Sequence, residues 1–291
     1  MKPYITLSIG VLAVSFAAIF IRLADAPPLV IAAYRLTIAS VILIPIASMK
    51  SRKGLNKLSR RDMLLILLSG VFLALHFGLW ITSLSYTSIA SSVVLVTSHP
   101  AFVAVISYFL WGERLNKLTI SGIVVALIGV IFINYGGLTG LTFGSQPILG
   151  DLLALLAAFA VGAYLIIGRQ LRARISILSY LTLLYSCSAV ILLAAALISG
   201  HSFFGYSPTT YLMLILLALI PQLLGHSCLN LAVRSIPVTF VSVAILGEPI
   251  GATILGWLIL SEIPTVNEIA GGLLILGGIF IVLRRRPEIK W

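Results

Sequence analysis

Residues 244–253 read "AILGEPIGAT" and place an acidic residue, Glu248, directly before a proline inside an apolar run. Far upstream, residues 96–105 read "VTSHPAFVAV", where His99 precedes Pro100 in the same way. Proline has no backbone N–H and clashes with the carbonyl four residues earlier, so a helix that contains it kinks and frees a carbonyl group. We therefore predict matching helix kinks at two distant places in the chain.

The second of these prolines, Pro249, follows Pro100 by 149 residues, and three further markers repeat at the same spacing. They are the pairs Glu113 and Glu262, Gly122 and Gly271, and Gly129 and Gly278. We predict that the chain consists of two five-helix halves, 1–140 and 141–291. Because five is an odd number, the second half should cross the membrane in the opposite sense. Such an inverted repeat is typical of secondary transporters.

The composition indicates an all-α polytopic membrane protein. Of the 291 residues, 60% are hydrophobic and 9% are charged, and the mean hydropathy is +1.16. A soluble domain carries about 25% charged residues. A transmembrane helix needs about 20 mostly apolar residues. On this rule we predict ten transmembrane helices, near residues 4–23, 30–49, 63–84, 88–111, 119–136, 150–169, 176–199, 209–232, 237–260 and 267–283.

The net charge of +11 does not indicate a nucleic-acid partner, because the basic residues fall between the predicted spans. With both termini in the cytoplasm, 17 of the 19 Lys and Arg residues lie in or beside cytoplasmic segments, as the positive-inside rule requires. The exceptions are Arg22, near an outer end, and Arg35, within the second span. We expect a multi-pass protein of the cell membrane, surrounded by lipid.

The two cysteines, Cys187 and Cys228, lie inside apolar runs, and no Cys/His cluster has the spacing of a metal site. We expect two buried thiols, no disulfide, and neither a metal nor another cofactor. The apolar run from Tyr4 to Ile21 is longer than the core of a signal peptide. We therefore expect it to be retained as the first span.

Four stretches together resemble the EamA-type branch of the drug/metabolite transporter superfamily: "APPLVIAAYRLTIAS", "HFGLWITSLSYTSIASSVVLVTSHPAFVAV", "FLWGERL" and "GHSCLNLAVRSIPVTFVSVAILGEPIGATILGWLILSE". The resemblance covers the whole chain and implies a ten-span carrier built from two inverted halves. Several members of this family resemble exporters of amino acids or related metabolites. The resemblance also implies a central cavity, with a histidine of span three at the position of His76. The family is broad in substrate, so the resemblance does not select one.

Ionisable side chains within a span are expensive to bury and suggest function by default. Glu248 could carry a proton or contact a cationic group, because desolvation favours a protonated carboxyl; alternatively it bonds to kinked backbone. His76, His99 and His226 could relay protons or bind substrate, or form bonds between helices. Arg35 could neutralise a substrate carboxylate in a coupling or gating role. The resemblance instead favours a structural clamp that binds backbone carbonyls or reaches toward the interface.

Two further side chains share a helix face with these histidines. Trp80 follows His76 by four residues, and Asn230 follows His226 by four, so each pair lies on one side of its helix. Such a face could offer a ring and a hydrogen bond to an amphipathic substrate, or it could serve helix packing. Weaker candidates for the same substrate site are Tyr164, Ser15 and Thr97.

The ends of the repeated spans carry acids and glycines. We expect Glu113 and Glu262 to act as gate or interface contacts. The glycines should allow close helix approach, and they would support a homodimer formed through spans five and ten.

The pattern favours a secondary carrier for small amphipathic metabolites, such as amino acids, most simply as an exporter. Proton coupling and facilitated diffusion both fit. A channel-like permease is the alternative, although no filter-like run of polar residues is present. An integral membrane enzyme is a third possibility, but it would need catalytic residue types clustered at one face, and the histidines are dispersed.

Overall fold

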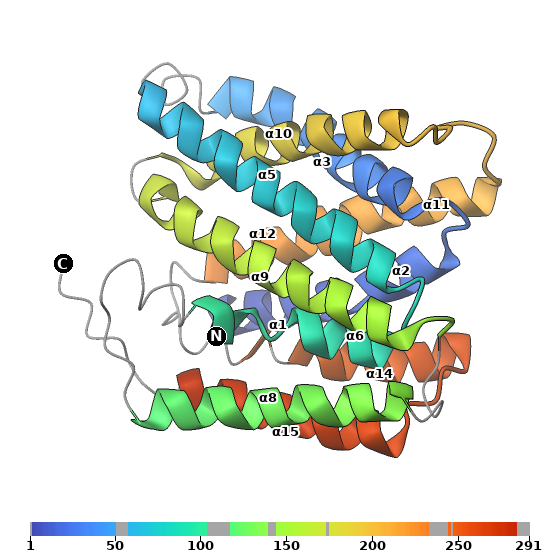
Figure 1. Ribbon diagram of the computed structural model, residues 1–291. Helices are drawn as coiled ribbons and strands as arrows, with labels where there is room; N and C mark the ends of the chain where they lie inside the picture. The colour runs from blue at the N-terminus through green and yellow to red at the C-terminus, as the bar shows by residue number, and fades with distance from the viewer. Residues whose placement is uncertain are drawn as a thin grey trace.

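The computed structural model describes residues 2–50, 58–103, 117–138, 144–172, 175–232, 244–245 and 247–283. These residues are helical and contain no β-strand. Figure 1 shows the helices lying beside one another, with the connecting loops gathered at two opposite ends. In chain order the elements are α1 (Lys2–Ser15), α2 (Ala17–Leu23), α3 (Pro28–Lys50), α5 (Arg60–Ser83), α6 (Ile89–Val96), α8 (Lys117–Leu138), α9 (Pro147–Arg172), α10 (Ile177–Ile198), α11 (Pro208–Leu217), η1 (Ala218–Gly225), α12 (His226–Ala232), α14 (Gly247–Leu260) and α15 (Val266–Leu283).

Six segments are long and apolar enough to cross a membrane: Pro3–Leu23, Pro28–Lys50, Arg60–Ser83, Pro147–Gly168, Ile177–Ile198 and Pro208–Leu229. Four shorter apolar helices cover Ile89–Val103, Ile120–Phe132, Gly247–Leu260 and Val266–Ile281. Each of these ten segments overlaps one of the ten predicted spans. An all-helical protein with several membrane-spanning helices is thus confirmed, whereas crossing by all ten segments stays a prediction.

Two predicted spans are interrupted. The first divides at Phe16 into α1 and α2. The Ser15 hydroxyl donates a hydrogen bond to the Val11 carbonyl at this point, and such a bond to the preceding turn bends helices. The eighth span passes from α11 through the π-helical turn η1 to α12, with Pro221 inside η1. Proline removes one helical hydrogen bond, which explains why a wider turn forms there.

The two predicted proline kinks differ. Helix α6 ends at Val96, and the chain turns before becoming helical again at His99 and Pro100. The His99 side chain bonds to the Val96 carbonyl, the group that Pro100 was expected to free. At the second proline, Ala244 and Ile245 are helical and α14 is described from Gly247. Leu246 lies outside the described residues, so a kink at Pro249 stays a prediction.

The repeated glycines bring α8 and α15 into close contact, and Figure 1 shows these two helices side by side. A Cβ atom on Gly129 would lie 2.6 Å from the Gly271 carbonyl oxygen, and one on Gly278 would lie 2.5 Å from the Gly122 carbonyl oxygen. Residue numbers rise along one helix as they fall along the other, so the pair is antiparallel. These glycines serve a contact within the chain, and a homodimer formed through them stays a prediction.

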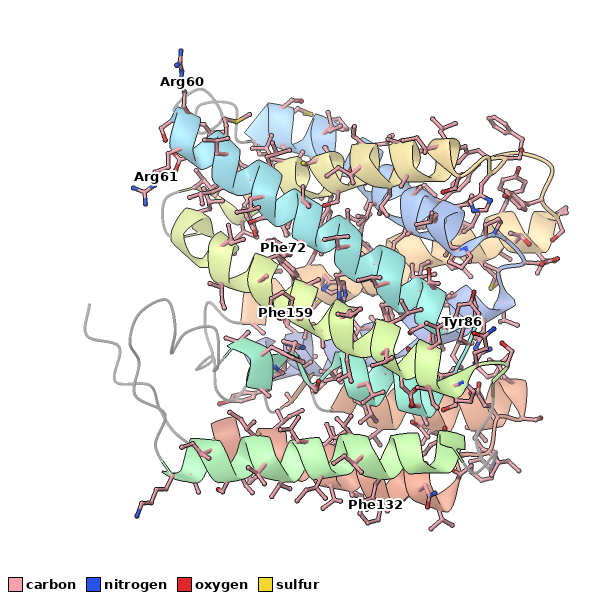
Figure 2. The ribbon with its side chains drawn as sticks, viewed as in Figure 1. Arg60, Arg61, Phe72, Tyr86, Phe132 and Phe159 are labelled. Carbon is pink, nitrogen blue, oxygen red and sulfur yellow. The ribbon has the colours of Figure 1, made fainter. Side chains whose placement is uncertain are left out.

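The buried core lies where α5 packs on α9, α3 packs on α10, and α1 packs on η1 and α12. Large apolar side chains are exposed on the outer surfaces of the helices, as expected where lipid surrounds the protein. Phe132 and Phe159 are two of them, and Figure 2 labels both. Arg60 and Arg61 lie at one end of the helices, and Tyr86 lies at the other.

Candidate functional site

A buried arginine organises the centre of the protein. Arg35, on α3, is 1% exposed. Its Nε donates a hydrogen bond to Gln222 Oε1 at 2.7 Å, and its Nη2 lies 3.4 Å from His226 Nε2. The guanidinium carbon lies 4.1 Å from the ring centre of Phe77 and 5.7 Å from that of Trp80. Two side-chain acceptors and a cation–π contact therefore fix this cation in place.

Whether Arg35 acts as a structural clamp or in coupling stays a prediction, but its described contacts differ from those expected of a clamp on backbone carbonyls. Its hydrogen bonds go to the side chains of Gln222 and His226 rather than to carbonyls of the backbone. The near-complete burial of its side chain excludes an interfacial position. Helix η1 packs against α3 and supplies Gln222, and His226 of α12 reaches the same guanidinium. The primary sequence does not place these acceptors near Arg35.

The hydrogen bonds define the tautomers of two histidines. A guanidinium can only donate, so His226 Nε2 accepts from Arg35 and the ring proton lies on Nδ1. His76 Nδ1 lies 3.0 Å from the Ala157 carbonyl oxygen. Because a carbonyl can only accept, His76 carries a proton on Nδ1. Its Nε2 is then an acceptor in the neutral ring.

Helix α5 supplies a row of rings to this site. His76 and Trp80 stack at an interplanar angle of 14°, with their centroids 6.1 Å apart. Phe77 meets His226 edge to face at 6.5 Å. The predicted shared face of His76 and Trp80 is therefore present, and it extends across to α12.

Helix η1 positions Gln222, a residue that the sequence alone did not single out. Gln222 follows Pro221 and is 1% exposed. A π-helical turn is wider than an α-helical one, and it occurs frequently at functional sites. The sequence signal that could have identified Gln222 was a proline followed by an amide residue inside an apolar span.

Glu248 supplies the carboxyl group near Arg35. It is half-buried in the first turn of α14, and it interacts electrostatically with Arg35. The two side chains do not form an ion pair. Among the described residues, the ion pair with its charged atoms within 4.0 Å of each other joins Arg22 and Glu262. The Ser15 hydroxyl lies 3.5 Å from the Glu248 backbone carbonyl oxygen, which links α1 to α14.

We call this group the central cluster. It comprises Arg35, His76, Phe77, Trp80, Gln222, His226 and Glu248. Tyr164 and Tyr185 lie near enough to interact electrostatically with Arg35, and His99 interacts in the same way with His76.

The remaining substrate-site candidates differ in position. Thr97 caps α6, and its hydroxyl donates to the Val93 carbonyl of its own helix, which favours a structural role. Asn230 belongs to α12, but its side chain lies outside the described part of the structure. Glu113 also lies outside the described residues.

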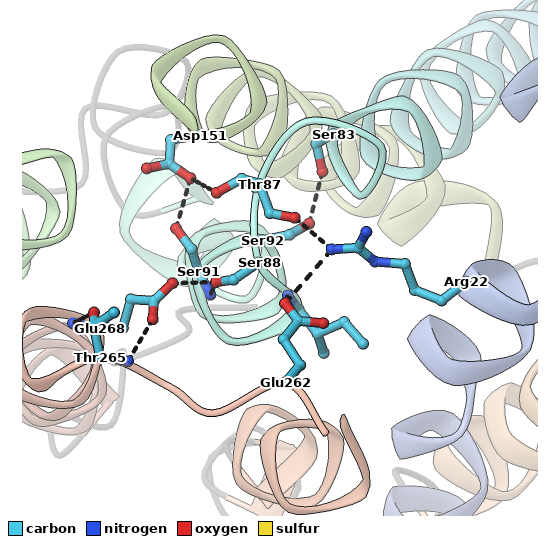
Figure 3. A network of polar contacts seen from close by, with 11 residues as sticks. Arg22, Ser83, Thr87, Ser88, Ser91, Ser92, Asp151, Glu262, Thr265 and Glu268 are labelled. Carbon is cyan, nitrogen blue, oxygen red and sulfur yellow. Dashed lines mark hydrogen bonds and ion pairs between the residues drawn. The ribbon is translucent and has the colours of Figure 1, made fainter. Parts of the chain in front are cut away.

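A second polar group occupies the end of the helices near Tyr86 (Figure 3). We call it the loop-end network, and it comprises Arg22, Thr87, Ser88, Ser91, Asp151, Glu262, Thr265 and Glu268. Arg22 donates to the Thr87 carbonyl at 2.6 Å and pairs with Glu262 at 3.5 Å. Glu262 also accepts the backbone N–H of Ile89 at 2.6 Å. This carboxylate thus joins the end of α2 to the beginning of α6.

Two further acids complete the loop-end network. Asp151 accepts hydrogen bonds from Thr87 at 2.8 Å and from Ser91 at 2.6 Å. Glu268 accepts from the Ser88 hydroxyl and from the Thr265 N–H. Both acids are almost completely buried. The sequence did not reveal them, because an acid near the beginning of a span is usually solvated, and their partners lie far away in the chain.

Burial raises the pKa of the Glu262 carboxyl above its usual value, whereas Arg22 and the Ile89 N–H act in the opposite direction. The ion pair therefore does not fully offset the loss of water around this group. Glu262 was predicted to be a gate or interface contact. Its position between segments from the two predicted halves is compatible with that role.

Within the described residues, no group of three or more His, Cys, Asp or Glu side chains is arranged to hold a metal ion. Cys187 and Cys228 are free thiols and half-buried.

Comparison with known proteins gives the family. The model of the EamA-like transporter family matches residues 1–135 and again residues 148–284. An "Uncharacterized transporter" of Clostridium kluyveri is 27% identical over 252 residues, which cover 84% of this chain and 79% of that protein. The "Pseudopaline exporter CntI" of Pseudomonas aeruginosa is 30% identical over 221 residues, covering 75% of this chain and 74% of the exporter.

A solved crystal structure has the same fold, with a TM-score of 0.67 at 18% sequence identity, covering 96% of each chain. The family model spans most of the chain, and the relatives are named as transporters. The apolar helices identify the protein as a multi-pass membrane protein. The chain belongs to the EamA-like transporter family.

Proposed function

We propose that this protein is a secondary transporter that exports amino acids or related small amphipathic metabolites by alternating access. The observation that carries the proposal is the central cluster, which gathers a cation, a carboxyl, two histidines and aromatic rings from helices of both predicted halves. Burying such groups is costly, and apolar packing would serve stability better. Charged groups beside a ring surface match a small molecule with polar and apolar parts.

We infer that the two halves form an inverted repeat. The family model matches twice in succession, and helices α3 and α10 begin 149 residues apart. The glycine contacts between α8 and α15 are reciprocal. Gly129 contacts Gly271, and Gly278 contacts Gly122. Adding 149 to 129 gives 278, and subtracting 149 from 271 gives 122, so the two contacts join equivalent positions. Equivalent helices that run antiparallel support opposite crossing of the membrane by the two halves.

The loop-end network supplies a gate in this proposal. With both termini in the cytoplasm of the cell, the network lies at the outer face, and it ties α2 and α6 to α9, α14 and α15. Its bonds would have to break before a substrate could leave outward. The arrangement supports a conformation that is closed to the outside.

The direction of transport rests on the family and on its named exporter. The relative from Pseudomonas aeruginosa is named for the export of pseudopaline. We propose export for this chain, with amino acids as the first compounds to be tested.

Counterflow in proteoliposomes tests the proposal. The purified full chain is reconstituted, the vesicles are loaded with an unlabelled amino-acid mixture, and entry of labelled amino acids is followed with and without a pH gradient. We expect saturable exchange. Flux that does not saturate would favour the channel-like alternative, and absence of flux would remove the amino-acid assignment.

The same vesicles test proton coupling through Glu248. The Glu248→Gln substitution keeps the shape of the side chain but removes its titration. We expect the variant to retain exchange while losing the dependence of net transport on pH. An unchanged pH dependence with normal activity would show that Glu248 carries no proton.

A further inference from the structure

Two hydrogen-bond donors of the central cluster are buried without a partner among the described residues. They are Arg35 Nη1 and Trp80 Nε1. An unpaired buried donor normally costs about 1–3 kcal/mol, so two of them in one cluster are unusual in a folded protein. The guanidinium carbon lies 5.7 Å from the Trp80 ring centre, so both donors belong to neighbouring side chains.

The guanidinium cannot turn to satisfy itself. Gln222 holds its Nε, His226 holds its Nη2, and the Phe77 ring lies against its face. Trp80 is similarly held by its stacking on His76. These contacts hold in place both side chains that carry the free donors.

The charge of Arg35 also lacks a direct counterion in the described part of the chain. Glu248 interacts with it electrostatically but does not form an ion pair within 4.0 Å. A molecule with a negative and a positive end could lie between them. Its anion would neutralise Arg35, and its cation would face Glu248.

We propose that Arg35 Nη1 and Trp80 Nε1 form the subsite for the carboxylate of the substrate, with Glu248 facing its amino group. The inference rests on the transport function proposed above. A carboxylate has two oxygens that accept hydrogen bonds in one plane, so one oxygen can bind each donor. The His76 and Phe77 rings leave the rest of the subsite suited to an apolar side chain. The transported class is then the zwitterionic α-amino acids rather than amines or their amides.

The test compares acids with matched amides. Counterflow with the full chain is measured for each of the common amino acids, and for every one that is exchanged its carboxamide is offered as competitor. The amide keeps the size and the amino group but lacks the anion. We expect the wild type to favour each acid over its amide by a factor of about ten or more, the effect of one charged hydrogen bond.

Two variants address the donors separately. Trp80→Phe keeps an aromatic ring and removes the N–H, and it should raise the KM for the acid about tenfold with little change for the amide. Arg35→Gln should abolish the preference for the acid. Trp257→Phe is the matched control, because Trp257 is 55% exposed on α14, and it should behave as the wild type.

The ratio of acid to amide transport separates binding from folding. A variant that merely folds poorly loses both activities together, and its ratio stays that of the wild type. If Arg35→Gln does not fold, Trp80→Phe decides. An unchanged ratio in Trp80→Phe, or equal transport of acid and amide by the wild type, would overturn the subsite while transport stands. If no amino acid is exchanged, the subsite assignment is wrong, and exchange of a labelled cell extract then shows whether the protein transports at all.

Discussion

At the scale of single residues, the central cluster joins binding chemistry to structural support. His76 illustrates this, because its ring stacks on Trp80 while its Nδ1–H bonds to the Ala157 carbonyl on a neighbouring helix. The same side chain therefore stacks within the cluster and ties α5 to α9. Substitutions here should affect stability and binding together.

We expect His76→Ala to lower substrate affinity and also the free energy of unfolding. The Ala157 carbonyl would lose its partner, which costs about 1–3 kcal/mol when a buried group is left unsatisfied. Thermal unfolding in detergent and counterflow KM measure the two effects. His201→Ala, in the loop before α11, is the control. Wild-type affinity in His76→Ala would assign His76 to packing alone.

Glu262 gives a prediction for pH. Burial raises the pKa of this carboxyl, so the folded protein binds its proton more tightly than the unfolded chain does. The stabilisation is then complete below the usual carboxyl pKa of about 4.3, and it is lost as pH rises through the raised pKa. The melting temperature of the wild type should fall relative to that of Glu262→Gln between about pH 4 and neutrality.

Thermal unfolding of both proteins across this pH range provides the measurement. Asp25→Asn, which replaces an exposed acid in the loop after α2, is measured alongside as a charge-matched control. A wild type that gains stability relative to Glu262→Gln with rising pH would mean that the Arg22 pair outweighs burial.

At the scale of helices, glycine sets the distance between α8 and α15. Alanine at position 129 or 278 would place a methyl group against backbone of the partner helix. Gly277, on the same helix as Gly278, has no neighbouring atom within 4 Å of the place where a Cβ atom would lie. The chain thus contains a matched set of tight and open positions.

We expect Gly129→Ala and Gly278→Ala each to reduce stability by about 1–3 kcal/mol, as overpacking does in well-packed interiors. The two losses should be similar, because the contacts are reciprocal. Gly277→Ala should have no such effect, and melting temperatures in detergent compare the three. Equal behaviour of all three variants would contradict the close approach.

The sequence was sufficient to predict the helical segments and a close helix approach at the glycines, because apolar runs and glycines act locally. That the glycines join α8 and α15 of one chain was not predicted. The sequence was insufficient to identify Gln222, Asp151 and Glu268 as members of the two polar groups. Gln222 meets Arg35 from 187 positions away, and Ser88 meets Glu268 from 180 positions away. Such pairings depend on which helices pack together, and a single sequence does not contain that information.

At the scale of the whole molecule, the inverted repeat predicts the sides on which equivalent residues lie. Arg60 and Thr209 are 149 residues apart and both are exposed near helix beginnings. In a background with both native cysteines replaced by alanine, Arg60→Cys should react with an impermeant thiol reagent only from the cytoplasmic side. Thr209→Cys should react only from outside. Labelling of both from one side would exclude opposite crossing by the two halves.

The edge-to-face pair of Phe77 and His226 joins two positions that are themselves 149 residues apart. His99 and Glu248 are likewise separated by 149 residues. In the proposed inverted repeat, equivalent positions at the centre thus carry unlike side chains. We expect a carrier built in this way to have unequal resting populations facing the two compartments, and an affinity that differs between the two sides. Such a built-in bias would give the protein a preferred loading side even when no gradient is applied.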